Sequence, residues 1–223
     1  MLSNQGEIEG SANIGVTGLN VDGAYALTNH FFVGGNFNTS GIKMYELNGG
    51  FYARTSPLGR IELQIGADLG SQSGNESYYT PDDHFPYWTC SYHTNLNSIF
   101  FQPIMASIGK VGEIGFGFRF EYTSFPGFYF ESQDFDGSPS GATSTIVNSW
   151  NNQLFSGAML YWAIGNRHVR LKMQVEVRIP NYNSSSYLLT PFQPYYSINC
   201  IIGLQIRLFN RWEENKPNPI IYQ

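Results

Sequence analysis

The residues that could carry acid–base or metal chemistry gather in one polar stretch. It reads Pro81-Asp82-Asp83-His84, and a second histidine, His93, follows shortly after. Carboxylate and imidazole groups can ligate a metal ion or act as a general acid–base pair. However, Asp, His and Ser are common in any polar loop, and no diagnostic metal or catalytic spacing is present. We therefore expect no catalytic residue, no metal and no cofactor, and a lipid-modifying enzyme with its site at a loop rim remains the alternative.

Charged residues elsewhere alternate with large apolar residues, most regularly in Gly112–Tyr122, GEIGFGFRFEY. Side chains on a strand point to opposite faces in turn. One face therefore holds only large apolar groups, and the other holds charges and glycines. In a soluble sheet the apolar face meets a core, whereas in an outer-membrane barrel it meets lipid and the polar face meets the lumen.

The same alternation, interrupted by turn residues, predicts ten strands. They cover Glu7–Gly15, Leu19–Leu27, Phe31–Asn38, Ile42–Arg54, Arg60–Gly70, Leu96–Ile108, Gly112–Tyr122, Asn152–Ile164, Val169–Ile179 and Tyr195–Phe209. Three long segments interrupt the series, at Ser71–Asn95, Thr123–Asn151 and Pro180–Pro194. We expect one barrel domain over residues 1–223, with residues 210–223 as a periplasmic tail.

The connections favour an up-and-down transmembrane barrel of ten strands, with eight strands as the fallback. All three long connections follow odd-numbered strands, so in an antiparallel barrel they share one rim, as the extracellular loops of outer-membrane barrels do. Aromatic residues fall at both strand ends, as two interfacial belts would. They are Tyr45, Phe101, Tyr122, Phe155 and Tyr196 at the long-loop ends, and Phe31, Phe51, Trp162, Phe209 and Trp212 at the other ends. A soluble ligand-binding β-barrel, with the polar face outward, remains open.

Composition supports the membrane interpretation. Charged residues make up only 13% of the chain and aromatic residues 16%, whereas soluble domains average about 25% charged residues. The net charge of −5 gives no basic footprint, so we expect no nucleic acid partner. The start of the sequence shows no signal peptide, and the two cysteines, Cys90 and Cys200, lie in contexts that make a disulfide unexpected.

The polar faces of the predicted strands carry charges of both signs. Because unpaired charges inside a lumen would be costly, mixed signs predict a network of ion pairs that largely plugs a narrow barrel. Its predicted members are Glu46, Glu62, Asp68, Arg119, Glu121, Arg170, Lys172, Glu176, Arg178 and Arg207. A selective channel or proton path is the competing interpretation.

Aromatic residues crowd the first two long segments. Exposed aromatic loops favour contact with a protein partner or a glycan. The candidate contact residues are Tyr78, Tyr79, Phe85, Tyr87, Trp88, Tyr92, Phe128, Tyr129 and Trp150. The equally open alternative is that these rings pack on one another and cap the barrel mouth.

Several short motifs resemble a known family. They are Gln5-Gly6-Glu7, Gly23-Ala24-Tyr25-Ala26, Thr28-Asn29-His30, Phe101-Gln102-Pro103 and the ending Gly203–Leu208. This pattern resembles the small outer-membrane β-barrel proteins of Bacteroidota, many of which are lipoproteins. The resemblance implies a bacterial outer-membrane location, and an acylated cysteine upstream that is either trimmed off or absent here. The last strand also resembles, in part, the carboxy-terminal signal for barrel insertion.

Taken together, these patterns predict a non-enzymatic outer-membrane barrel. We expect it to act as a structural or accessory subunit that presents its extracellular loops to a partner or glycan. The expected partners are outer-membrane lipid and a larger outer-membrane protein complex.

Overall fold

The chain folds into β-strands in a computed structural model. The structure describes residues 5–15, 18–39, 42–56, 58–79, 86–109, 111–134, 143–147, 152–166, 168–180 and 198–208. The strands are β1 (Ile8–Gly15), β2 (Gly18–Ala26), β3 (Phe31–Asn38), β4 (Ile42–Arg54), β5 (Gly59–Tyr79), β6 (Pro86–Ile108), β7 (Gly112–Ser124), β8 (Tyr129–Asp134), β9 (Thr143–Val147), β10 (Gln153–Gly165), β11 (Val169–Pro180) and β12 (Ile198–Leu208). Among these residues, no helix is long and apolar enough to cross a membrane.

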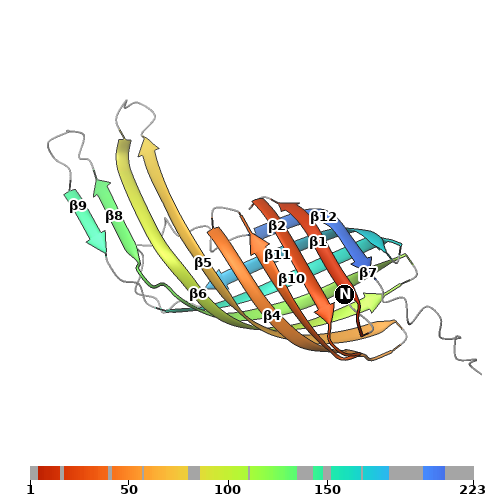
Figure 1. Cartoon of the computed structure of the whole chain (residues 1–223). Helices are drawn as coiled ribbons and strands as arrows, with labels where there is room; N and C mark the ends of the chain where they lie inside the picture. Colours follow the sequence, from red (N-terminus) through yellow and green to blue (C-terminus); the bar gives the residue numbers. More distant parts are fainter. Residues whose placement is uncertain are drawn as a thin grey trace, which may run out of the picture.

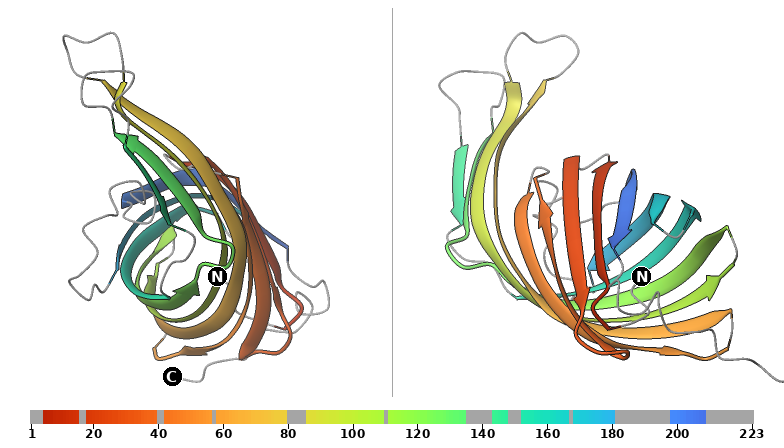
Figure 2. Two further views of the ribbon diagram at one scale, coloured as in Figure 1. Left: turned by 90° about the vertical axis from the view of Figure 1, so that its left-hand side faces the viewer. Right: turned by 45° about the vertical axis from the view of Figure 1, so that its right-hand side comes forward.

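Ten of the strands close into one antiparallel barrel. Their order is β5-β4-β3-β2-β1-β12-β11-β10-β7-β6, and β6 pairs again with β5 to complete the ring (Figures 1 and 2). The predicted all-β, ten-stranded antiparallel barrel is confirmed, and the fallback of eight strands is wrong. The predicted tail at residues 210–223 lies outside the described residues.

Four strands form a sheet that projects beyond one rim of the barrel. Strands β5 and β6 stay paired as far as Tyr79 and Pro86, with a register shift between Tyr78 and Tyr79. Strand β8 pairs with the outer part of β6, from Trp88 to His93, and β9 pairs with β8. Figures 1 and 2 show both hairpins rising away from the other barrel strands. We call this part, residues 73–79, 86–93, 129–134 and 143–147, the projecting sheet.

The projecting sheet corrects two predicted loops. Much of Ser71–Asn95 is strand, and Thr123–Asn151 contains β8 and β9. The prediction failed because the outward face of β5 changes from isoleucine and leucine to Ser71, Ser73 and Asn75 while the strand continues. Once both faces are polar, apolar alternation no longer marks a strand.

The barrel is apolar outside and polar inside. On β7, Phe118 is 45% exposed and points outward, whereas Arg119 and Glu121 are 6% and 2% exposed inside the barrel. The same arrangement holds on β1, where Ile8 and Ile14 are exposed and Glu9 is buried. The alternative of a soluble barrel with its polar face outward is therefore wrong.

The predicted aromatic belts are correct only in part. Tyr45 and Tyr122 are exposed on the side of the projecting sheet, and Phe31 and Phe51 are exposed near the opposite rim. Phe155 was predicted to join the first belt, but it points into the barrel and is buried, because it has the same parity on β10 as Met159. Tyr196, Phe209 and Trp212 lie outside the described residues.

The short turns opposite the projecting sheet are fixed by side-chain caps. The Thr28 hydroxyl oxygen accepts hydrogen bonds from the backbone N–H groups of His30 (3.1 Å) and Phe31 (3.0 Å). The Asn166 amide oxygen accepts equivalent bonds from His168 and Val169, each at 2.8 Å. In such tight turns, the side-chain oxygens accept hydrogen bonds from backbone N–H groups and so fix the conformation of the turn.

Candidate functional site

The interior of the barrel holds the densest cluster of titratable groups, centred on Arg119 of β7. Its three guanidinium nitrogens each donate to a different carboxylate: Nη1 to Glu46 (2.9 Å), Nη2 to Asp68 (2.6 Å) and Nε to Glu121 (2.9 Å). The guanidinium also lies 3.6 Å from the centre of the Phe100 ring. Three strands are therefore tied together through one side chain.

Arg178 of β11 extends this cluster. It donates to Glu121 at 3.3 Å and to Glu176 at 2.7 Å. The resulting group of four carboxylates and two guanidinium groups joins β4, β5, β7 and β11 across the lumen. We call it the Arg119 network.

A second set of ion pairs lies nearer the short-turn rim. Arg207 pairs with Glu9 (2.6 Å), Arg170 with Glu113 (3.0 Å) and Arg60 with Glu62 (2.8 Å). The Tyr161 hydroxyl donates to Glu113 at 2.7 Å. Lys172 makes a longer contact, 3.7 Å to Asp22. All ten side chains predicted for the lumen network thus lie inside the barrel, although in two groups and not in one.

The sequence prediction missed the aromatic partners of these charges. Phe100 lies under Arg119, and the Tyr52 ring lies 4.6 Å from the Arg60 guanidinium. Both residues share the inward parity of neighbouring charged residues, which is the only sequence signal that could have revealed them.

Interior aromatic rings lie over glycines of the adjacent strand. Four directly paired positions show this: Phe32 with Gly50, Phe100 with Gly66, Tyr92 with Gly74 and Tyr161 with Gly115. At each glycine a Cβ atom would overlap the ring of its partner. Inward-facing glycine therefore makes room for an aromatic ring in a narrow lumen.

Replacing Gly115 with valine is expected to lower the free energy of unfolding by about 1–3 kcal/mol, because Tyr161 must leave its place and its bond to Glu113. The matched control is Gly10→Ala on the outward face, where the nearest atom to an added Cβ is at 3.6 Å. Denaturant unfolding in lipid vesicles measures both. Equal stability of the two variants would contradict this packing.

Aromatic side chains pack together at the barrel mouth below the projecting sheet. Tyr92 and Phe128, two of the predicted contact residues, are buried there, in a cluster that also contains Cys90, Leu96, Phe125, Phe130 and Phe155. For these two residues the structure shows the packed alternative and not the exposed one. The turn from β7 to β8 brings Phe125 and Phe128 inward, and the Asn95 N–H donates to the Pro126 carbonyl (3.1 Å).

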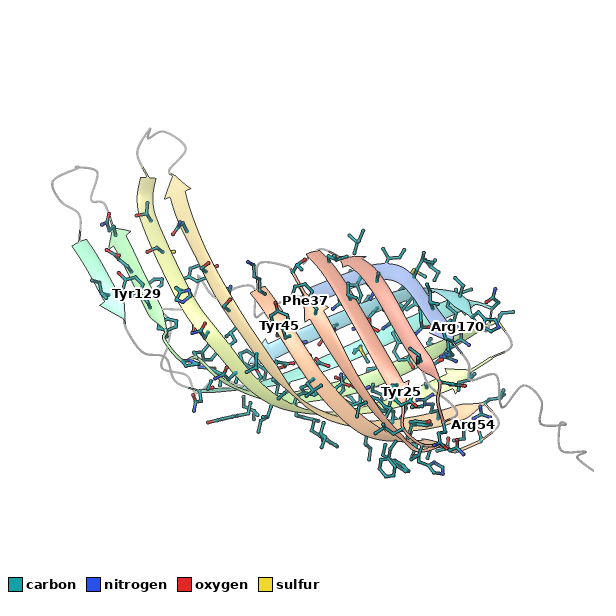
Figure 3. The ribbon with its side chains drawn as sticks, in the orientation of Figure 1. Tyr25, Phe37, Tyr45, Arg54, Tyr129 and Arg170 are labelled. Carbon is teal, nitrogen blue, oxygen red and sulfur yellow. The ribbon has the colours of Figure 1, made fainter. Side chains whose placement is uncertain are left out.

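Tyr129 is the candidate contact residue that stays exposed. It lies on β8, far from Arg54 and Arg170 near the opposite rim (Figure 3). Its hydroxyl donates to Glu131 at 2.7 Å, and this hydrogen bond raises the pKa of the Tyr129 hydroxyl. The side chains of Tyr78, Tyr79, Tyr87 and Trp88, and all of Phe85 and Trp150, lie outside what the structure describes.

The histidines do not assemble a site in the described part of the chain. His30 and His168 lie in short turns, and His93 is exposed on β6, where it pairs with Tyr129. His84 and Pro81-Asp82-Asp83 fall outside the described residues. Within the described ranges, no group of three or more His, Cys, Asp or Glu could hold a metal ion.

A cavity of about 200 Å³ lies inside the barrel, and all ten barrel strands contribute to its wall. Its charged lining residues are Glu9, Asp22, Glu46, Glu62, Glu113, Glu176, Arg60, Arg119, Lys172 and Arg178. Ile104 and Met159 give the wall an apolar side. The lumen is thus filled by side chains around this polar cavity.

Comparison with known proteins gives a structural likeness at low sequence identity. No family model matches the sequence, and no curated protein matches it. Among solved structures, the fold is similar to the crystal structure of the outer membrane protease OmpT from Escherichia coli. The TM-score is 0.48 and the sequence identity 11%, over 91% of this chain and 94% of that chain.

Proposed function

We propose that this protein is a non-enzymatic outer-membrane barrel with a closed interior, and that it works by presenting its projecting sheet to a partner outside the cell. One observation carries the proposal. The outward face of β5 and β6 is apolar up to Leu69 and Ile99 and polar beyond, while both strands continue past that boundary. Because β5 and β6 continue beyond the apolar band as one antiparallel pair, they hold the surface at their outer ends at a fixed distance from the band.

The height of the apolar band fits a membrane. On β5 it runs from Ile61 to Leu69, eight residues apart. At a rise of roughly 3.3 Å per residue this is about 26 Å along the strand. With a strand tilt of about 40°, the band spans about 20 Å, close to the ~25 Å of bacterial outer-membrane barrels. The resemblance of the sequence motifs to Bacteroidota barrel proteins supports the same location.

The side on which the sheet projects supports an extracellular orientation. The connections at the other rim are short turns, and β1 begins and β12 ends there. In bacterial barrels the short turns lie in the periplasm and the long connections outside. The projecting sheet then stands in the extracellular space.

We expect no stable conductance when the purified barrel is inserted in planar lipid bilayers. The Arg119 network bridges the lumen, and the aromatic cluster around Phe128 closes its mouth. Current recordings at a range of voltages measure this. Long-lived open-channel steps from the wild-type barrel would contradict a closed interior and favour a selective channel.

Shortening the β5–β6 hairpin is expected to abolish partner binding without affecting barrel insertion. The pair Gly74 and Tyr92 would be joined directly by an Asn-Gly turn in place of residues 75–91, which keeps Tyr92 in the mouth cluster. The measurement is affinity purification from detergent-solubilised native outer membranes, with heat-modifiable gel migration as the check on folding. Unchanged co-purifying proteins with the shortened barrel would contradict a docking role of the sheet.

A further inference from the structure

The cavity inside the barrel is large enough for a ligand, and the proposed docking role does not use it. A cavity of about 150 Å³ can hold benzene, and this one measures about 200 Å³. Its wall combines charged and amide side chains with an apolar patch at Ile104 and Met159. A small organic molecule with both polar ends and methylene groups fits such a wall.

The charge of the lumen decides which class of molecule fits. The wall itself carries six carboxylates and four cationic side chains. Directly behind it, Arg170 and Arg207 add two cations, and Asp68 and Glu121 add two carboxylates. With or without these four side chains, the carboxylates exceed the cations by two. Excess negative charge in the lumen favours a cationic guest.

Hydrogen-bond acceptors on the wall are left over as well. Asp22 uses one carboxylate oxygen for Ser11, Asn13 and Lys172, and Glu176 uses one for Arg178. The second oxygens of Asp22 and Glu176 are therefore available to a ligand that donates.

We propose that this cavity binds a small organic cation with primary ammonium groups, of the aliphatic diamine or triamine class. The ammonium groups donate to Asp22 and Glu176, and the methylene groups lie against Ile104 and Met159. The amine adds positive charge beside these two carboxylates, so it stabilises the barrel from inside.

The test uses the full-length barrel refolded in detergent with putrescine or spermidine, then desalted and examined by native mass spectrometry and calorimetry. We expect one amine to be retained per barrel, with no retention of glucose, a neutral molecule of similar size. The isosteric double variant Asp22→Asn/Glu176→Gln is expected to bind at least about tenfold more weakly. The control variant Glu131→Gln, on the projecting sheet, is expected to bind as the wild type does.

Three results would overturn the proposal. They are no retained amine with the wild-type barrel, equal affinity of the double variant, and glucose bound as tightly as spermidine. The first and third need no variant, so the proposal stays testable even if the double variant does not refold. Heat-modifiable migration shows whether it does.

Discussion

Arg119→Met is expected to lower the free energy of unfolding by about 3–5 kcal/mol, because it leaves three carboxylates without their shared cation. Arg119 is almost fully buried and donates to Glu46, Asp68 and Glu121 at 2.6–2.9 Å. Methionine fills a similar volume and removes all three bonds and the contact with Phe100. Denaturant unfolding of the barrel in lipid vesicles measures the loss.

A matched control and a rescue separate charge from packing. Arg54 lies exposed at the end of β4, and Arg54→Met is expected to change stability by less than about 0.5 kcal/mol. Adding Glu46→Gln, Asp68→Asn and Glu121→Gln to Arg119→Met removes the uncompensated charge and is expected to restore much of the loss. An Arg119→Met barrel as stable as the wild type would show that the Arg119 network does not hold the barrel together.

Phe118→Arg is expected to destabilise the membrane-inserted barrel by about 2–4 kcal/mol, the value for arginine at the lipid-facing midplane of a bacterial barrel. Phe118 lies at the centre of the outward row on β7 between Ile114 and Tyr122. A guanidinium there meets hydrocarbon on the outside, since the inward side of the strand is occupied by Arg119 itself.

The control for Phe118→Arg is Ser73→Arg on β5. Ser73 has the same outward direction but lies beyond the apolar band, so its replacement is expected to change stability by less than about 0.5 kcal/mol. Both variants are measured by denaturant unfolding in the same vesicles. Equal effects at the two positions would mean that the outward face of β7 does not contact lipid.

The barrel was predictable from sequence because its two faces differ so sharply. In Gly112–Tyr122 every second residue is large and apolar, and that period fixes both the strand and its faces. The interior charges could be assigned to the lumen for the same reason. Alternation does not give register across distant strands, so the three carboxylates that share Arg119 could not be named from the sequence.

The projecting sheet was missed because it lacks this contrast. Ser73, Asn75 and Ser91 face water, so no apolar row marks the strand there. For the aromatic residues at the mouth, the sequence left exposed contact and mutual packing equally open. Tyr92 and Phe128 lie in segments that were predicted as loops, and only the strands β6, β7 and the neighbouring β10 bring them together with Phe155.

If the barrel is inserted as proposed, its apolar outer face lies in lipid up to Leu69 and the projecting sheet stands in water. Spin labels on single cysteines at Leu63, Ile65, Leu69, Ser73 and Asn75 test it most directly, in a Cys90→Ala/Cys200→Ala background that removes both native thiols. In lipid vesicles the account predicts that Leu63, Ile65 and Leu69 are accessible to oxygen and shielded from a water-soluble nickel relaxant. Labels at Ser73 and Asn75 are expected to be accessible to the nickel relaxant and less accessible to oxygen. Access of the nickel relaxant to all five positions would show that the outer face of β5 does not lie in lipid.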